Sequence, residues 1–235
     1  MDMFRRIFFA AVLAGVVAGL ALSAIQQWRV VPLILQAEHF ENDLAHAEGA
    51  ATSQPHTDEP SDGSGPWAPG NGFERTFYTV LATMLVSVGF ALVIGAVSVL
   101  LSMEITLANG AIWGLGGFLA FSLAPAFGLP PVLPGMELGD LGDRQFWWWG
   151  TALATGGGLL AMAKFRSVFA LALGLLLIIA PHIIGAPSTP DMQSQLPAHL
   201  AAAFTASTLT ASMVYWLIAG SLIGLFNQRF TKGAA

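Results

Sequence analysis

The stretch FYTVLATMLVSVGFALVIGAVSVLL at residues 77–101 contains no Asp, Glu, Lys or Arg. A helix needs about 20 predominantly apolar residues to cross the hydrocarbon core of a membrane, so this stretch predicts a transmembrane helix. Other apolar stretches without Asp, Glu, Lys or Arg occur at 8–25, 111–127, 146–163, 168–184 and 204–226, and among these only 168–184 contains a histidine. The sequence therefore predicts an all-α integral membrane protein that folds as a bundle of six transmembrane helices.

The composition supports this fold class. The chain has 235 residues, of which 55% are hydrophobic and 10% charged, whereas a soluble domain carries about 25% charged residues. We expect a single membrane domain over residues 1–235. The net charge of −5 and the lack of any Lys or Arg run argue against a nucleic-acid partner. The absence of cysteine excludes disulfides and thiolate metal sites.

The first apolar stretch has two interpretations. Arg5 and Arg6 precede it and small residues close it, as in a secretory signal. The stretch is long for a signal, and Ile25 with the following glutamines makes a poor mature start. We therefore expect that this helix is retained and that the chain has six spans. If the stretch is instead a signal that is cleaved, five spans remain.

Basic residues in the short loops set the expected orientation. Arg5, Arg6, Lys164, Arg166, Arg229 and Lys232 fall on one side of a six-span chain. Arg29, Arg75 and Arg144 fall on the other side. This asymmetry predicts that both termini lie in the cytoplasm. It also predicts one long extracytoplasmic loop over residues 26–75, in which 29–47 form a projecting or interfacial helix and 49–72 are flexible.

Histidines and acids gather on the predicted outer side of the membrane. His39, Asp43 and His46 are spaced i, i+4 and i+7, so they share one face if this segment is helical. Imidazole and carboxylate together suit Co²⁺, Ni²⁺ or Zn²⁺. The alternative is a solvated acidic loop whose histidines bind nothing.

A second group of candidate ligands lies near the membrane surface. His182 follows Pro181, which interrupts the helical hydrogen bonds near the end of its span and frees backbone carbonyls. His199 precedes the last span. Asp140 and Asp143 follow the proline-rich segment 130–136. Each of these residues is a candidate metal ligand, and each is also compatible with an ordinary interfacial position.

Other patterns predict packing. Gly pairs spaced GxxxG begin at Gly15, Gly110 and Gly220 and are typical of closely packed membrane helices. Spans 111–127 and 168–184 both end in an Ala-Pro…Gly-x-Pro pattern, which indicates either a duplicated hairpin or coincidence. The run of three tryptophans at 147–149 predicts an interfacial aromatic anchor.

Several absences argue against an enzyme. The chain lacks the P-loop pattern of ATP hydrolysis, and it also lacks HExxH and GxSxG. No carboxylate lies inside a predicted span, which disfavours a proton-coupled pump.

The chain resembles the CbtA family of predicted cobalt transporter subunits. The resemblance rests on MFRRIF at residues 3–8, LPPVLPG at 129–135, the Asp140-Leu141-x-x-Arg144-Gln145-x-Trp147-Trp148 segment, APHIIGAP at 180–187 and the final span. It implies a bacterial inner-membrane protein with five or six spans that works with CbtB, a short single-span partner bearing histidines, in cobalt supply for cobalamin synthesis.

Residues and resemblance together predict a subunit for uptake of Co²⁺, or of Ni²⁺, with no permanently bound cofactor. The metal would be gathered by His39, Asp43 and His46 and passed to His182, His199, Asp140 and Asp143. The alternative is a non-transporting scaffold, in contact with membrane lipid, that assembles a partner complex or a homo-oligomer through its glycine faces. A lipid-modifying enzyme with outer His and acid groups has little support in the sequence.

Overall fold

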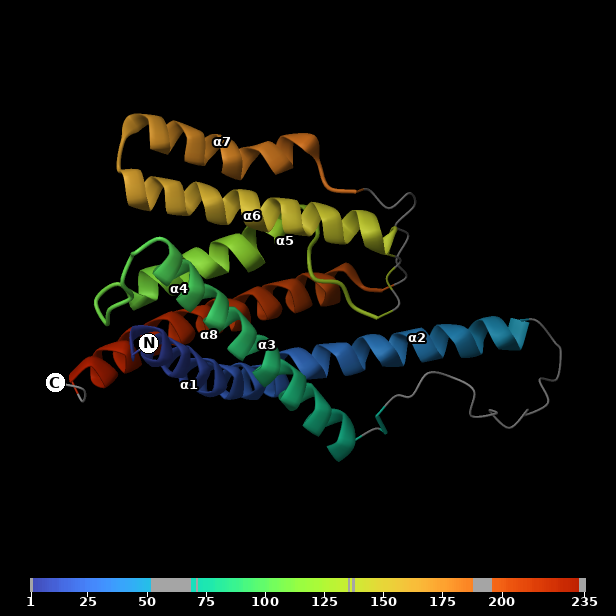
Figure 1. Ribbon diagram of the computed structural model, residues 1–235. Helices are drawn as coiled ribbons and strands as arrows, with labels where there is room; N and C mark the ends of the chain where they lie inside the picture. The colour runs from blue at the N-terminus through green and yellow to red at the C-terminus, as the bar shows by residue number, and fades with distance from the viewer. Residues whose placement is uncertain are drawn as a thin grey trace.

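The computed structural model describes residues 2–51, 69–70, 72–134, 136, 138–187 and 196–232, with side chains for 4–41 and for the later described residues up to 231 (Figure 1). All secondary structure in these residues is helical. The elements are α1 (Asp2–Ile25), η1 (Gln26–Val30), α2 (Val31–Ala51), α3 (Phe73–Leu100), α4 (Gly110–Phe118), η2 (Leu119–Leu123), α5 (Ala124–Gly128), α6 (Leu141–Phe165), α7 (Val168–Ile184) and α8 (Ala198–Lys232).

Four helical stretches are long and apolar enough to cross a membrane: Phe4–Glu41, Phe73–Leu100, Gly110–Gly128 and Ala198–Thr231. They coincide with four of the predicted spans and support an all-helical multi-pass architecture. The other two predicted spans also form helices. However, α7 has 17 residues, and the apolar residues of α6 are diluted by glycine, threonine and tryptophan. That α6 and α7 cross the membrane therefore stays a prediction.

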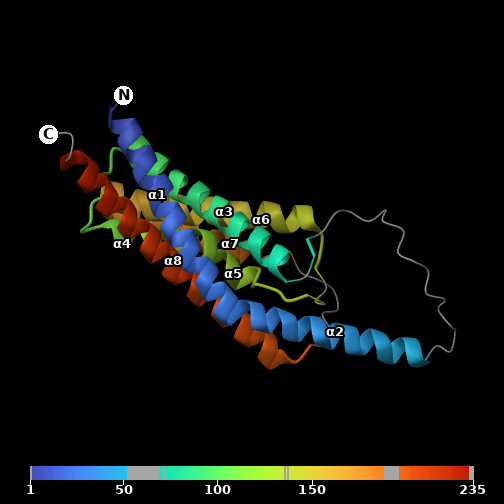
Figure 2. The same ribbon diagram turned by 90° about the horizontal axis from the view of Figure 1, so that it is seen from below.

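The first helix runs through the start of the predicted outer loop. α1, the π-helical η1 and α2 follow one another without a break, and α2 extends beyond the bundle (Figures 1 and 2). The apolar helix Phe4–Glu41 has 38 residues, which span about 57 Å, nearly twice the hydrocarbon thickness of a bilayer. Part of this helix must therefore project, in agreement with the expected projecting helix over 29–47. Residues 52–68 of the loop lie outside the described residues.

An ion pair ties the projecting helix back to the bundle. Arg75, in the first turn of α3, contacts both carboxylate oxygens of Glu38 in α2, at 2.5 Å from Nη2 and 3.2 Å from Nη1. Two parallel bonds fix the angle between guanidinium and carboxylate better than one bond can. This pair therefore links α2 to the first turn of α3.

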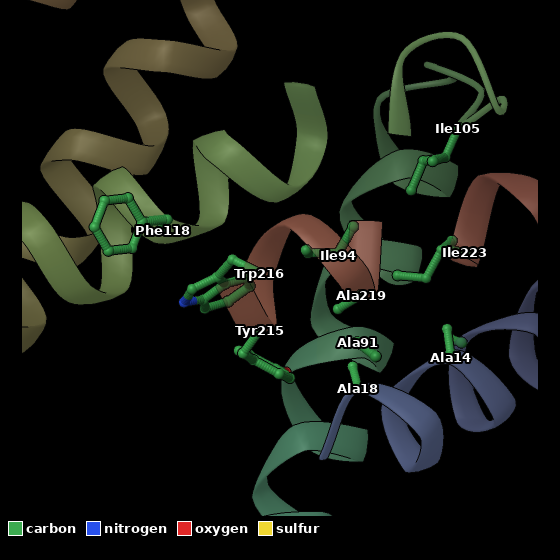
Figure 3. Packing of buried hydrophobic residues seen from close by; sticks show 11 residues of the cluster. Ala14, Ala18, Ala91, Ile94, Ile105, Phe118, Tyr215, Trp216, Ala219 and Ile223 are labelled. Carbon is green, nitrogen blue, oxygen red and sulfur yellow. The ribbon is translucent and has the colours of Figure 1, made fainter. Parts of the chain in front are cut away.

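The main core lies where α1, α3, α4 and α8 meet (Figures 2 and 3). Small residues of α1 and α3 pack there against large ones of α8, as Figure 3 shows for Ala14, Ala18, Tyr215, Trp216 and Ile223. The hydroxyl of Tyr215 donates a hydrogen bond to the Ser87 carbonyl at 3.0 Å. All four helices belong to candidate spans, and their packing positions the rest of the chain.

The predicted glycine motifs pack helices within the chain. A Cβ on Gly15 would lie 2.6 Å from the Cα of Val88 in α3. A Cβ on Gly114 would overlap the carbonyl oxygen of Trp216 in α8, and one on Gly220 would overlap that of Gly110. These faces are therefore occupied inside the chain, which removes the main support for a scaffold that binds its partners through them.

α6 and α7 form an antiparallel hairpin that packs on η2 and α5 (Figure 1). Gly158 and Gly174 allow a close approach of the two helices, since a Cβ on Gly158 would lie 2.7 Å from the Gly174 carbonyl oxygen. α3 instead packs mainly on α1, and α4 on α8. The two segments expected to be duplicated hairpins are thus packed differently.

Both termini lie at the same end of the bundle, together with the α6–α7 turn (Figure 1). Arg6 at this end donates to Asn227 Oδ1 at 3.0 Å, and Asn227 Nδ2 donates to the Ile105 carbonyl at 3.0 Å. Lys164 Nζ donates to the Leu101 carbonyl at 3.2 Å. This gathering of basic residues agrees with the predicted cytoplasmic side; the orientation itself stays a prediction.

Candidate functional site

Three cavities meet at the opposite end of the bundle, around residues 128–132, where α5 and α7 end and α6 and α8 begin. We name them by their neighbouring helix. The α7 cavity, of about 580 Å³, lies between η2, α5, α6 and α7. The α6 cavity, of about 660 Å³, lies between the start of α6, η2 and α8. The α8 cavity, of about 670 Å³, lies between the proline-rich segment and the start of α8.

His182 lines the α7 cavity near its mouth and is the ionisable residue among its described lining. The imidazole ring lies edge-on to Trp147, with centroids 5.9 Å apart, and to Phe127, at 6.1 Å. The side chain is otherwise exposed. The imidazole is therefore held between two aromatic rings in a residue that stays exposed.

Trp147 fixes the end of α7. Its side chain is 9% exposed, and its Nε1 donates to the Pro181 carbonyl at 3.3 Å. Gly128 makes room for this ring, because a Cβ there would overlap Trp147 and lie 2.7 Å from Ala186 Cβ. A glycine at the end of α5 therefore allows α5, α6 and the end of α7 to meet beside His182.

Prolines interrupt the helices on both sides of the α7 cavity. Pro125 is the second residue of α5, which directly follows the π-helical η2, and Pro181 lies inside α7. A proline has no N–H to donate, so a carbonyl about one turn earlier loses its usual helical partner. The carboxyl ends of helices carry partial negative charge, and Gly128 at the end of α5 and His182 near the end of α7 line the cavity. The partial negative charge of these helix ends favours a cation. Phe121 and Leu177, one turn before the two prolines, are not among the described lining of this cavity.

Two buried threonine hydroxyls on α6 have no hydrogen-bond partner among the described residues. Thr155, 2% exposed, lines the α7 cavity, whereas Thr151, 0% exposed, lines none of the three cavities. An unsatisfied buried hydroxyl costs about 1–3 kcal/mol. The fold therefore tolerates an unfavourable buried hydroxyl, that of Thr155, in a residue that lines the α7 cavity together with His182.

The other two cavities have the opposite electrostatic character. Arg144 lines both of them, and they adjoin the amino ends of α6 and α8, which carry partial positive charge. Hydroxyls line the deeper part of the α6 cavity, where Ser122 and Ser212 lie 2.7 Å apart. A guanidinium repels a divalent cation, so the α7 cavity is the better cation site of the three.

The structure does not bring the predicted metal ligands together. Within the described residues, no three His, Asp or Glu side chains lie close enough to hold one metal ion. His39 is exposed on α2, and His199 is exposed in the first turn of α8 and lines none of the three cavities. The side chains of Asp43 and His46 lie outside the described residues.

Asp140 and Asp143 occupy the start of α6. Asp140 is the N-cap residue, and its Oδ1 accepts a hydrogen bond from the Asp143 backbone N–H at 2.9 Å. Asp143 is an exposed acid in the first turn, where it complements the helix dipole. Helix capping accounts for both carboxylates without a metal, so their role as ligands stays a prediction.

Sequence reasoning missed Trp147 and Thr155. The tryptophan run was expected to anchor at the interface, which is wrong for Trp147 because it is buried against His182; Trp149 is 53% exposed. A signal for the buried face exists in the sequence. Trp147, Thr151 and Thr155 are spaced i, i+4 and i+8, which places them on one face of a helix.

Comparison with known proteins identifies the family. Residues 4–228, nearly the whole chain, match the family described as "Probable cobalt transporter subunit (CbtA)". No curated protein and no solved structure matches the chain. The match covers nearly all of the four candidate membrane helices and all three cavities, and it confirms the resemblance found in the sequence motifs. This multi-pass membrane protein therefore belongs to the CbtA family of probable cobalt transporter subunits.

Proposed function

We propose that this chain takes up divalent cobalt across the bacterial inner membrane, as one subunit of a transporter. The observation that carries the proposal is the α7 cavity, which combines one imidazole with the carboxyl ends of two helices and has no Lys or Arg among its described lining. Neutral imidazole is a good ligand for Co²⁺ and Ni²⁺. The family supports cobalt as the cargo.

The acidic outer residues serve to concentrate the cation. In the predicted orientation, the end of the bundle that carries the α7 cavity faces outward. His39, Asp43 and His46 on α2 take the ion first, and Asp140, Asp143 and His199 at the same end draw it toward His182. Fixed negative charge near an entrance raises the local cation concentration.

Other subunits complete the transporter. His182 supplies a single imidazole, and a transition-metal ion needs several donors for stable binding. We expect a small, single-span partner of the CbtB kind, bearing histidines, to supply further nitrogen ligands. The chain has no P-loop pattern, so the driving force for uptake comes from the partner subunit or from the membrane potential. That potential is worth about 2.3 kcal/mol per unit charge per 100 mV. We expect no catalytic activity.

Uptake of radiolabelled Co²⁺ tests this function. Cells that lack other cobalt importers express the wild-type chain, alone and with the partner, with Ni²⁺ as competitor. We expect uptake above that of cells without the chain and its loss in His182→Ala, because that substitution removes the cavity's imidazole. Full uptake in His182→Ala contradicts the role of the cavity.

Two neighbouring variants serve as controls. Ile183→Ala changes the next, exposed residue of α7 and should leave uptake intact, so a loss in both variants indicates damage to the helix end. His199→Ala tests the predicted second histidine separately. Reduced uptake supports His199 as a ligand on the path, and unchanged uptake removes it.

A further inference from the structure

The α6 and α8 cavities share one cationic side chain that has no counter-charge. Arg144, half-buried near the start of α6, lines both cavities. Its guanidinium forms no hydrogen bond or ion pair with any described residue, whereas that of Arg75 pairs with Glu38. Neither cavity has an Asp or Glu among its described lining. An unpaired guanidinium, which can only donate hydrogen bonds, is a binding group for an anion.

The α6 cavity also contains a spare hydroxyl hydrogen. Ser122 and Ser212 both line this cavity, and their hydroxyls share one hydrogen bond at 2.7 Å. Trp216 Nε1 donates to Ser122 Oγ at 3.1 Å. The two hydroxyls have two hydrogens, of which one makes the mutual bond, so the other has no acceptor among the described residues, whichever serine donates. The serine pair therefore suits a ligand that brings an acceptor oxygen.

The aromatic lining indicates that the α6 cavity lies at the level of the lipid headgroups. Trp148 and Trp149 line it together with Arg144, and Trp149 is 53% exposed. Indole rings concentrate at the boundary between membrane and water. Most of the other lining residues are apolar, among them Leu141 and Leu209. A guanidinium at the membrane surface, beside an apolar cavity, fits an amphiphile with an anionic head better than a soluble anion.

We propose that the α6 cavity binds an anionic phospholipid, with the lipid phosphate on the Arg144 guanidinium and the acyl ester region inside the cavity. Parallel N–H groups of a guanidinium match two phosphate oxygens. The ester carbonyls of the lipid only accept hydrogen bonds, which suits the spare hydroxyl hydrogen of the serine pair. The ammonium group of a zwitterionic lipid finds no carboxylate among the described lining. This inference does not depend on the proposed cobalt transport.

Lipid binding to the purified chain tests this site. Native mass spectrometry in detergent measures the Kd for the first molecule of phosphatidylglycerol. Arg144→Gln should raise this Kd about tenfold, the effect of one lost hydrogen bond to a charged group. Arg29→Gln is the matched control, because Arg29 is exposed, is predicted to lie on the same side of the membrane and lines none of the three cavities. It should retain the wild-type Kd.

Two tryptophan substitutions on α8 test whether the acyl region enters the cavity. Leu209→Trp places a large ring in the α6 cavity, which Leu209 lines, and should weaken phosphatidylglycerol binding. Met213→Trp changes a residue one turn further along, which is 38% exposed and lines none of the three cavities, and should not weaken binding.

Thermal unfolding separates loss of the site from loss of the fold. Without lipid, Arg144→Gln should have the wild-type Tm, because the guanidinium has no partner among the described residues. Phosphatidylglycerol should raise the Tm of the wild-type chain and of Met213→Trp, since a bound ligand stabilises the folded state, and should raise that of Arg144→Gln much less. A lowered Tm of lipid-free Arg144→Gln overturns the inference in favour of a structural role.

Four binding results would also overturn the inference. These are an unchanged Kd in Arg144→Gln, equal weakening in Arg144→Gln and Arg29→Gln, equal affinity for phosphatidylcholine, and unchanged binding in Leu209→Trp. Displacement of the lipid by an equal concentration of inorganic phosphate would instead identify a soluble phosphate as the ligand and overturn the lipid assignment. Cobalt uptake is measured separately, so the lipid site and the proposed function can each fail without the other.

Discussion

Alanine at Gly114 should destabilise the protein by about 3 kcal/mol or more, the upper range for overpacking of a close-packed interior. The new Cβ would overlap the Trp216 carbonyl oxygen, and Leu217 Cα would lie 3.2 Å away, so α4 and α8 would have to separate. A backbone obstacle cannot rotate aside as a flexible side chain can. We expect a large fall in Tm and in the amount of folded protein recovered from the membrane.

Gly116→Ala is the matched control, two residues along the same helix. A Cβ at Gly116 meets no atom within 4 Å. Alanine is favoured over glycine in a helix interior by about 1 kcal/mol, so this variant should unfold at the same or a higher temperature. Similar stability of the two variants would contradict the close contact of α4 with α8.

Replacement of Trp147 by alanine should cost about 3–5 kcal/mol, as is usual for loss of a buried aromatic side chain, and should also abolish cobalt uptake. The indole is buried, contacts His182 and donates to the Pro181 carbonyl. Its loss leaves a void at the end of α7 and removes one wall of the site that positions the imidazole. Thermal unfolding and uptake measured on the same preparation test both effects.

Two comparisons identify which part of Trp147 matters. Trp149→Ala removes an exposed ring from the same turn and should change stability by no more than about 0.5 kcal/mol. Trp147→Phe keeps a ring but loses the N–H and part of the indole volume, so it should cost more than the roughly 1 kcal/mol of one hydrogen bond and less than Trp147→Ala. Equal effects of Trp147→Ala and Trp149→Ala would contradict the buried position of Trp147.

The sequence predicts much of the fold because membrane spans depend on length and apolarity. All six predicted stretches form helices, and the glycine motifs at Gly15, Gly110 and Gly220 lie at close contacts between helices. The partners of those glycines were not predictable. GxxxG spacing shows that a helix can approach another closely, but it contains no information about which helix that is.

The site was only partly predictable. His182 and Pro181 were identified from their position at the end of a span, and the structure places both at the α7 cavity. Thr155 could not be assigned, because a threonine inside an apolar stretch usually bonds its own helix, and only the three-dimensional packing reveals that this hydroxyl is unpaired. The outer ligands were expected to cluster, yet clustering depends on how α2 projects, which local spacing does not determine.

The placement of α8 has a consequence for biosynthesis. This helix packs against α1 and α4 and supplies Tyr215, Trp216 and Ile223 to the main core. A ribosome delivers α1, α3 and α4 to the membrane before α8 exists, so their largest apolar partner arrives late. Until then the glycine faces at Gly110 and Gly114 contact lipid or other membrane proteins. The chain is therefore most open to quality control in the membrane during the interval before its last described helix is inserted.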